Sequence, residues 1–215
     1  MSGDWNMHLA KRVIGRIQSG LKSYGPSKLK RRMWDAEYST DKWDFADNTM
    51  GDCVYGHLEK HAKNGSILDL GCGTNTGNEL ADGCYRRYVG TDISEVCLSK
   101  ARKRTKELGR AAKNDFVMAD FLTYVPTEKF DVILFRESMY HVPMNKIKET
   151  LDRYTQYLTD RGVFVVRMAT SGPDGVTKQR PAAMFDIIER EFKIIEKGLH
   201  EKAGSKATVL VFRPA

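Results

Sequence analysis

The sequence lacks the features of several large protein classes. Its 215 residues include only four cysteines, and no two of them form a Cys-x-x-Cys pair, so a disulfide framework is not indicated. No apolar run is long enough to cross a bilayer, and the first residues contain no hydrophobic stretch of the signal-peptide type. No internal repeat is present. We therefore expect a protein of a reducing compartment, with cytoplasmic localisation.

Two catalytic signatures are also missing. No Gly-Lys-Ser or Gly-Lys-Thr closes a glycine-rich turn, which argues against a triphosphate-binding P-loop. His57 and His61 have the spacing of two zinc ligands on a helix, but the glutamate that accompanies such a pair in zinc proteases is absent. We interpret this pair as an ordinary helix face and expect no metal.

A glycine-rich turn is the most informative feature that is present. An apolar run from Ser66 to Leu70 leads into Gly71, Gly73 and Gly77. Buried parallel strands have this apolar character, and glycines let backbone N–H groups and a helix N-terminus approach a ligand closely. The glycine spacing differs from the Gly-x-Gly-x-x-Gly fingerprint of dinucleotide-binding enzymes. The turn therefore predicts a nucleotide-cofactor site of another type.

Three later apolar runs also end in polar residues. The second run, residues 88–93, contains Asp92 about twenty residues after the turn, where a ribose diol would find its acceptor. The third, residues 115–121, contains Asp120, and the fourth, residues 130–135, leads into a polar loop. Either aspartate alone would more often be a helix N-cap, but their order along the chain favours a shared ligand.

On these motifs, the sequence resembles the class I S-adenosylmethionine-dependent methyltransferases of the small-molecule type, which carry Asp-x-Gly-x-Gly-Thr after the first strand. The resemblance covers roughly residues 30–213. It implies S-adenosyl-L-methionine as cofactor, S-adenosyl-L-homocysteine as product, and no metal. The cofactor-binding residues that it implies are Asp69, Gly71, Gly73, Asp92, Ile93, Asp120, Phe121 and Tyr38.

The resemblance also assigns roles to these residues. The glycine turn would lie against the methionine half of the cofactor, with Asp69 near its ammonium group. Asp92 would bind both ribose hydroxyls and Asp120 the adenine amine, between adenine walls formed by Ile93 and Phe121. The chain has Asn75 where many members of the family have a third glycine.

A segment before the first strand is rich in aromatic residues. It resembles the Trp-Asp-x-x-Tyr element that closes over the cofactor in many small-molecule methyltransferases. By this resemblance Tyr38 would contact the methionine carboxylate, and Trp34 or Trp43 would face the substrate. The aromatic side chains could instead only pack the segment against the core. We also count Arg136 among the substrate residues.

The loop after the fourth apolar run lies where the methyl acceptor must bind. A sulfonium methyl group is already activated, so a base is needed only when the acceptor arrives protonated. His141 titrates closest to neutrality and is the first choice for this base, Glu137 is the second, and Tyr140 would orient the acceptor. A structural or cofactor-side role for His141 remains the alternative.

The same loop narrows the acceptor class. It lacks the Pro-Pro-Tyr motif of enzymes that methylate planar amide or base nitrogens, and no cysteine follows the fourth or fifth strand for covalent attack on a pyrimidine. We therefore expect N- or O-methylation of a small metabolite, and the basic N-terminal segment described below favours an anionic one. An RNA or protein methyltransferase that holds a polyanion is the alternative, and a non-enzymatic cofactor-binding subunit is a third reading.

The basic charge is concentrated at the N-terminus. Residues 1–32 contain eight Lys or Arg and one acid, so this segment carries a formal charge of +7, equal to that of the whole chain. From Met7 to Leu21, apolar residues fall on one half of a helical wheel and Lys11, Arg12 and Arg16 on the other. Such a helix could cover the active site, guide an anionic substrate, or lie on an anionic membrane. We expect a mobile cap whose apolar face closes over the site, with nucleic acid and membrane as less favoured partners.

Apolar and polar patterns along the rest of the chain predict an α/β fold. Helices are expected near residues 95–108, 146–158 and 182–190, and a strand at 162–168, which together predict a doubly wound, mostly parallel sheet. Two final strands, at 192–200 and 207–212, should form an antiparallel hairpin, as at the end of the family's Rossmann-like seven-stranded sheet. We divide the chain into a cap at residues 1–50 and a methyltransferase domain at residues 51–215.

Overall fold

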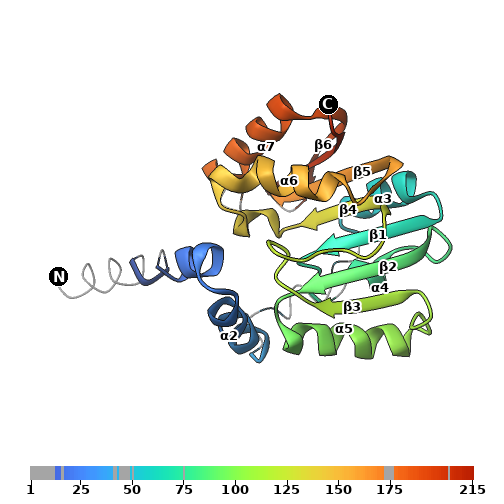
Figure 1. The fold of residues 1–215 in the computed structure, drawn as a ribbon, viewed down its shortest axis with the longest axis horizontal. Coiled ribbons are helices and arrows are strands. Elements are labelled where there is room, and N and C mark those ends of the chain that lie inside the picture. Colours follow the sequence, from blue (N-terminus) through green and yellow to red (C-terminus); the bar gives the residue numbers. More distant parts are fainter. Residues whose placement is uncertain are drawn as a thin grey trace.

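The computed structural model describes residues 13–15, 17–40, 43, 49, 51–74, 76–171, 177–202 and 204–215. Its centre is one seven-stranded sheet with the order β3-β2-β1-β4-β5-β7-β6 (Figure 1). The strands are β1 (Gly65–Leu70), β2 (Tyr85–Asp92), β3 (Asn114–Met118), β4 (Phe130–Arg136), β5 (Leu158–Ala169), β6 (Lys193–Lys202) and β7 (Ser205–Arg213). The first five strands pair in parallel, and β7 pairs antiparallel with both β5 and β6. The expected mostly parallel α/β sheet and its antiparallel end are confirmed.

Both faces of the central strands are buried. Alternate residues of one strand enter two separate apolar clusters: Leu68 and Ile133 lie in one, whereas Ile67 and Val132 lie in the other. Side chains of a strand alternate between the faces of a sheet, so helices must cover both sides. This explains why β1 and β4 read as continuous apolar runs.

Two of the helices, α2 (Ser27–Tyr38) and α3 (Val54–Ala62), precede β1. The helices in connections between strands are α4 (Thr76–Glu79), α5 (Glu95–Glu107), α6 (Ile147–Thr155) and α7 (Gln179–Glu191). The helix α5 begins where its sequence predicts, because the Ser94 side chain accepts a hydrogen bond from the Cys97 N–H (3.2 Å) and Glu95 stands in the first turn. No described helix is long and apolar enough to span a membrane.

The N-terminal part of the described chain is largely helical. Residues 13–15 and 17–24 are helical, and the helix ends before Gly25 and Pro26. The aromatic segment is helical only as far as Tyr38, where α2 ends, and Trp43 lies beyond it. The predicted helical residues Met7 to Arg12, and Arg16, lie outside the described residues.

Candidate active site

A cavity of about 1260 Å³ lies beyond the carboxyl ends of the parallel strands, where open α/β sheets bind ligands. Its walls come from the turn after β1, the loops after β2 to β5, the helix α2 and the β6–β7 hairpin. The cavity brings together most of the residues expected at the site. Those that line it are Trp34, Tyr38, Trp43, Gly71, Gly73, Asp92, Ile93, Asp120, Phe121, Arg136, Glu137, Tyr140 and His141. Asp69 is not among them.

The glycine turn has the backbone that its sequence requires. Gly71 and Gly73 have φ angles of 78° and 61°, in the left-handed region that favours glycine. A Cβ atom on Gly71 would lie 2.6 Å from the Cβ of Ser138, so a larger residue would also clash there. Gly77 packs against Tyr88 and does not line the cavity. Asn75 lies outside the described residues.

Asp92 is a buried carboxylate beside this turn. Its Oδ2 accepts a hydrogen bond from the Gly73 N–H (3.2 Å) and its Oδ1 one from the Ser94 N–H (3.0 Å). Burial raises the pKa of Asp92 to about 6, although these backbone hydrogen bonds oppose the rise. Among the described residues, backbone N–H groups donate the hydrogen bonds to Asp92, and Asp92 lines the cavity. A pair of hydroxyl donors would suit such a group.

Asp69 is buried behind the turn. Its Oδ2 accepts a hydrogen bond from the Tyr88 hydroxyl (2.8 Å), whereas its Oδ1 has no hydrogen-bond partner among the described residues. Burial raises the pKa of Asp69 to about 7. Because Asp69 does not line the cavity, it is placed to support the turn from behind.

Asp120 is held by the helix α2. Its Oδ2 forms an ion pair with Lys30 and accepts a hydrogen bond from the Ser27 hydroxyl (2.7 Å), while its Oδ1 accepts one from the Leu122 N–H (3.1 Å). Burial alone would raise the pKa of Asp120, but the contacts with Lys30 and Ser27 hold it below its usual value. The helix α2 is therefore attached to the loop after β3.

Aromatic rings of α2 and its neighbours form one side of the cavity. The centroid of Trp34 lies 5.1 Å from that of His141, edge to face, and 5.6 Å from that of Trp43. The Lys22 ammonium lies 3.8 Å from the Trp34 ring centroid and 2.7 Å from Glu37. This cation–π contact and ion pair fix Lys22 between the N-terminal helix and α2.

Glu137 adopts an unusual backbone conformation at the end of β4. Its φ angle is 53°, and few non-glycine residues enter this left-handed region. Its carboxylate accepts hydrogen bonds from Arg167, from the Tyr140 hydroxyl and from the Ala169 N–H (2.7 Å). Burial and the neighbouring Glu137 raise the pKa of Tyr140, so its hydroxyl stays protonated. The two side chains thus hold each other in place.

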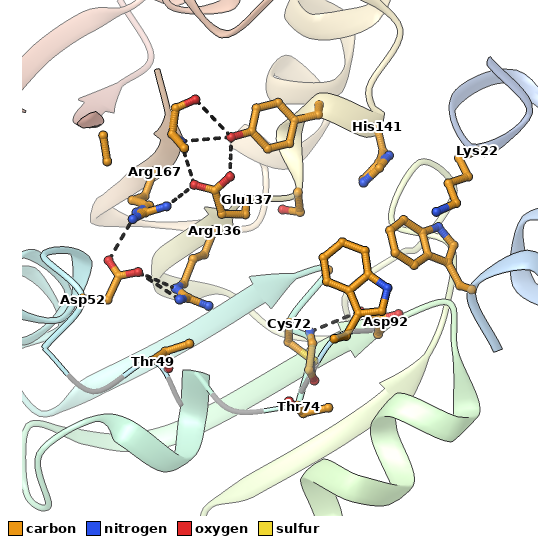
Figure 2. A pocket seen from close by; sticks show the side chains of 18 of the residues that line it. Lys22, Thr49, Asp52, Cys72, Thr74, Asp92, Arg136, Glu137, His141 and Arg167 are labelled. Carbon is orange, nitrogen blue, oxygen red and sulfur yellow. Dashed lines mark hydrogen bonds and ion pairs between the residues drawn. The ribbon is translucent and has the colours of Figure 1, made fainter. Parts of the chain in front are cut away.

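Asp52 and Arg167 belong to the site but were not predicted from the sequence. Asp52 lies between Arg136 and Arg167, as Figure 2 shows, with contacts of 2.9 Å and 3.3 Å to the two guanidinium groups. These cations hold the pKa of Asp52 below its usual value against the effect of burial. A charge inside the apolar run Val163–Met168 is the one sequence signal that could have revealed Arg167. No local sequence pattern identifies Asp52 as a residue of the site.

His141 also lines the cavity, near Lys22 and away from the ion pairs of Asp52 (Figure 2). Burial lowers the pKa of His141 to about 4, and the charges of Lys22 and Arg180 add to this effect. The imidazole is therefore neutral at physiological pH. It can accept a hydrogen bond or a proton from a group in the cavity.

The histidine pair on α3 lies outside this cavity. His57 Nδ1 lies 3.0 Å and His61 Nε2 3.1 Å from the two carboxylate oxygens of Glu196 on β6. In the part of the chain that the structure describes, no group of three His, Cys, Asp or Glu side chains could hold a metal ion. The pair joins α3 to the edge of the sheet.

Curated relatives are similar over part of the chain. A probable thiol methyltransferase of Arabidopsis thaliana is 33% identical over 104 residues, which are 47% of this chain and 44% of the relative. A trans-aconitate 2-methyltransferase of Rhizobium rhizogenes is 32% identical over 116 residues, 52% of this chain and 40% of the relative. The chain thus spans less than half the length of these relatives.

Solved structures share the fold. The N-methyltransferase NodS of Bradyrhizobium japonicum, solved with S-adenosyl-L-homocysteine, matches with a TM-score of 0.65 and 19% identity, over 86% of this chain and 97% of that one. A 1,6-didemethyltoxoflavin-N1-methyltransferase of Burkholderia thailandensis matches with a TM-score of 0.66 and 17% identity, over 86% of each chain.

A protein-family model also matches most of the chain. The model described as a methyltransferase domain matches residues 61–204, two thirds of the chain and all of the sheet up to the final hairpin turn. Together with the glycine turn after β1 and Asp92 after β2, this match shows that the chain belongs to the methyltransferase-domain family, within the class I S-adenosylmethionine-dependent methyltransferases.

Proposed function

We propose that the protein transfers a methyl group from S-adenosyl-L-methionine to a nitrogen or oxygen atom of a small anionic metabolite. One observation carries the proposal: a single cavity joins the glycine turn and Asp92 to the polar loop that contains Glu137 and His141. We call the first group, Gly71 to Gly73 with Asp92, the cofactor wall. The second group is the acceptor wall, comprising Asp52, Arg136, Glu137, Tyr140, His141 and Arg167.

The cofactor wall fits S-adenosyl-L-methionine. Asp92 would accept hydrogen bonds from the two ribose hydroxyls, which would compensate the burial of its charge. Backbone groups at Gly71 and Gly73 would line the methionine half, with the Tyr38 hydroxyl near its carboxylate. When bound, the cofactor supplies a sulfonium methyl group that needs no further activation.

Asp120 can serve the adenine amine without releasing α2. Each carboxylate oxygen has two acceptor positions. Lys30 and Ser27 occupy Oδ2, whereas Oδ1 accepts one hydrogen bond from the described residues, donated by the Leu122 N–H. One acceptor position therefore remains for the amine, between the side chains of Ile93 and Phe121 that line the same part of the cavity.

On the acceptor wall, His141 is the proposed base. Its neutral imidazole can take the proton that an amine or hydroxyl acceptor loses as the new bond forms. Glu137 is less suited to this task, because Arg167, Tyr140 and the Ala169 N–H already use its carboxylate. We propose that Glu137 positions Tyr140, and that Trp34 and Trp43 exclude water from the reacting atoms.

Charge in the cavity favours an anionic acceptor. Of the six lining carboxylates, all but Asp92 pair with a lining Lys or Arg; these five are Glu37, Asp52, Asp120, Glu137 and Glu201. Two further lining cations, Lys178 and Lys202, have no ion pair with a described carboxylate and are free to meet a substrate anion. A bound anion would also raise the pKa of His141 and so make it a stronger base.

A labelling experiment tests this proposal. The protein is incubated with methyl-labelled S-adenosyl-L-methionine and fractionated metabolite extracts, and labelled products are identified by mass spectrometry. We expect label in a small phosphate- or carboxylate-bearing compound, with a rate that falls several-fold in Lys202→Ala but not in Lys63→Ala, an exposed lysine that does not line the cavity. Label found only in RNA or protein would contradict the proposed acceptor class.

A further inference from the structure

The N-terminal helix exposes its apolar side chains. Val13, Ile14, Ile17, Leu21 and Tyr24 have exposed fractions of 48%, 54%, 57%, 38% and 63%. Of the eleven large hydrophobic side chains that are exposed in the described structure, these five and Leu29 lie between residues 13 and 29. An exposed apolar cluster of this kind marks a contact surface more often than a solvent face.

The opposite side of the same helix faces the cavity. Gly15, Gln18, Ser19 and Lys22 line it, with the spacing of one helix face. At about 100° per residue, the exposed apolar residues occupy an arc of about 100°, and the cavity-lining residues occupy a second arc of about 100° on the other side. The expected closure of the apolar face over the site is therefore not what the structure shows. The polar face lies toward the cavity and the apolar face lies away from it.

This helix extends away from the sheet and leads into α2 (Figure 1). The segment that contains it, residues 1–32, carries the whole formal charge of +7. Within the described part of that segment, Lys28 and Arg32 are also exposed, on either side of the exposed Leu29. An apolar stripe within a strongly basic segment has the composition of a helix that lies in the surface of an anionic bilayer.

We propose that the apolar stripe formed by Val13, Ile14, Ile17, Leu21 and Tyr24 docks on the surface of an anionic lipid bilayer. Charge selects this partner over a second copy of the chain, because two segments of +7 would repel each other whereas anionic headgroups attract them. Since no described helix can span a bilayer, the contact is a surface contact. Docking would place the helix between the bilayer and the part of the cavity that Gly15, Gln18 and Ser19 line.

Vesicle flotation tests the proposal. The full chain is mixed with vesicles of phosphatidylcholine alone, or of phosphatidylcholine with an equal part of phosphatidylglycerol. We expect binding to the anionic vesicles that weakens as salt is added. The double variant Ile14→Gln/Ile17→Gln should bind the anionic vesicles at least about tenfold more weakly, because it removes two apolar side chains from the contact.

A matched variant controls for surface hydrophobicity in general. Leu108→Gln/Val125→Gln removes two side chains of similar exposure, 51% and 63%, outside the helix, and should bind vesicles like the parent. Both double variants should keep the parental melting temperature and the parental affinity for S-adenosyl-L-homocysteine, because none of the four residues lines the cavity.

Three results would overturn the proposal. The first is no binding of the parent to anionic vesicles at low salt. The second is an equal loss of binding in the control variant. The third is concentration-dependent self-association, measured by light scattering, that Ile14→Gln/Ile17→Gln abolishes while vesicle binding is absent, since a second copy would then be the occupant. Each of these results leaves the proposed methyl transfer untouched.

Discussion

The two walls of the cavity satisfy their charges in different ways. On the cofactor wall, Asp92 is buried with hydrogen bonds from backbone N–H groups, and burial raises its pKa to about 6. On the acceptor wall, Asp52 and Glu137 are bound by Arg136 and Arg167. The first wall has polar capacity left for a ligand, whereas the second is nearly neutral by itself. The cofactor wall can therefore accept hydrogen bonds from a ligand, whereas the acceptor wall, apart from His141, is held in a fixed arrangement by its own ion pairs.

Removing Asp52, which links Arg136 and Arg167, should have the largest effect on the acceptor wall. Asp52→Ala leaves two partly buried guanidinium groups, Arg136 and Arg167, without their shared carboxylate, so we expect the free energy of unfolding to fall by about 3 kcal/mol. The measurement is urea denaturation followed by circular dichroism. The control, Asp115→Ala, removes an exposed partner of Arg87 and should cost less than about 1 kcal/mol. A loss from Asp52→Ala no larger than that of the control would show that the acceptor wall is not held together by these charges.

The pH dependence of stability should separate His141 from the carboxylates. The pKa of His141 is about 4 in the folded protein and about 6.5 when unfolded, so its stabilising contribution is full above pH 6.5 and is lost as the pH falls toward 4. Asp69 and Asp92, whose pKa values are raised, act in the opposite direction. The effect of His141 is therefore isolated by comparing the stability of the parent with that of a variant that lacks only the imidazole.

We expect the stability difference between the parent and His141→Gln to shrink by on the order of 3 kcal/mol between pH 7 and pH 4. Denaturation curves at each pH measure it. A difference that stays constant over this range would mean that neither burial nor the neighbouring cations lower the pKa of His141.

Turnover and product affinity should respond differently to a change on the acceptor wall. If His141 is the base, His141→Ala should lower turnover by about 10²-fold, while the affinity for S-adenosyl-L-homocysteine changes little. Steady-state rates with a saturating acceptor and calorimetry with the product measure the two effects separately. A collapse of product affinity would instead assign His141 to the cofactor wall.

The cofactor wall was readable from the sequence because its parts are local. Gly71 and Gly73 directly follow an apolar run, and Asp92 ends the next strand, so short-range pattern and chain order are enough to bring them together. On the acceptor wall, residues 136–141 were also predicted, because they follow the fourth apolar run. Asp52 and Arg167 were not predicted, and their contacts join three separate elements of the chain. Pairing of charges over such separations depends on tertiary packing, which no local pattern encodes.

The N-terminal helix shows a further limit of sequence analysis. Within the described residues 13–24, polar and apolar side chains separate into two faces, as the amphipathic pattern predicts. The pattern could not say which face turns toward the protein, because the usual rule places the apolar face inside. Here the contacts of Lys22 with Trp34 and Glu37 turn the polar face of the helix toward the protein. Specific polar contacts outweighed the general hydrophobic preference.

Calorimetric titration of S-adenosyl-L-homocysteine tests the central claim most directly. The account predicts binding to one site per chain with micromolar-range affinity, weakened in Asp92→Asn by on the order of 2 kcal/mol, or about 30-fold, because charge-assisted hydrogen bonds to the ribose are lost. The exposed control Asp82→Asn should bind like the parent. Equal affinity in Asp92→Asn and Asp82→Asn, or no binding by the parent, would contradict the assignment of this wall to the cofactor.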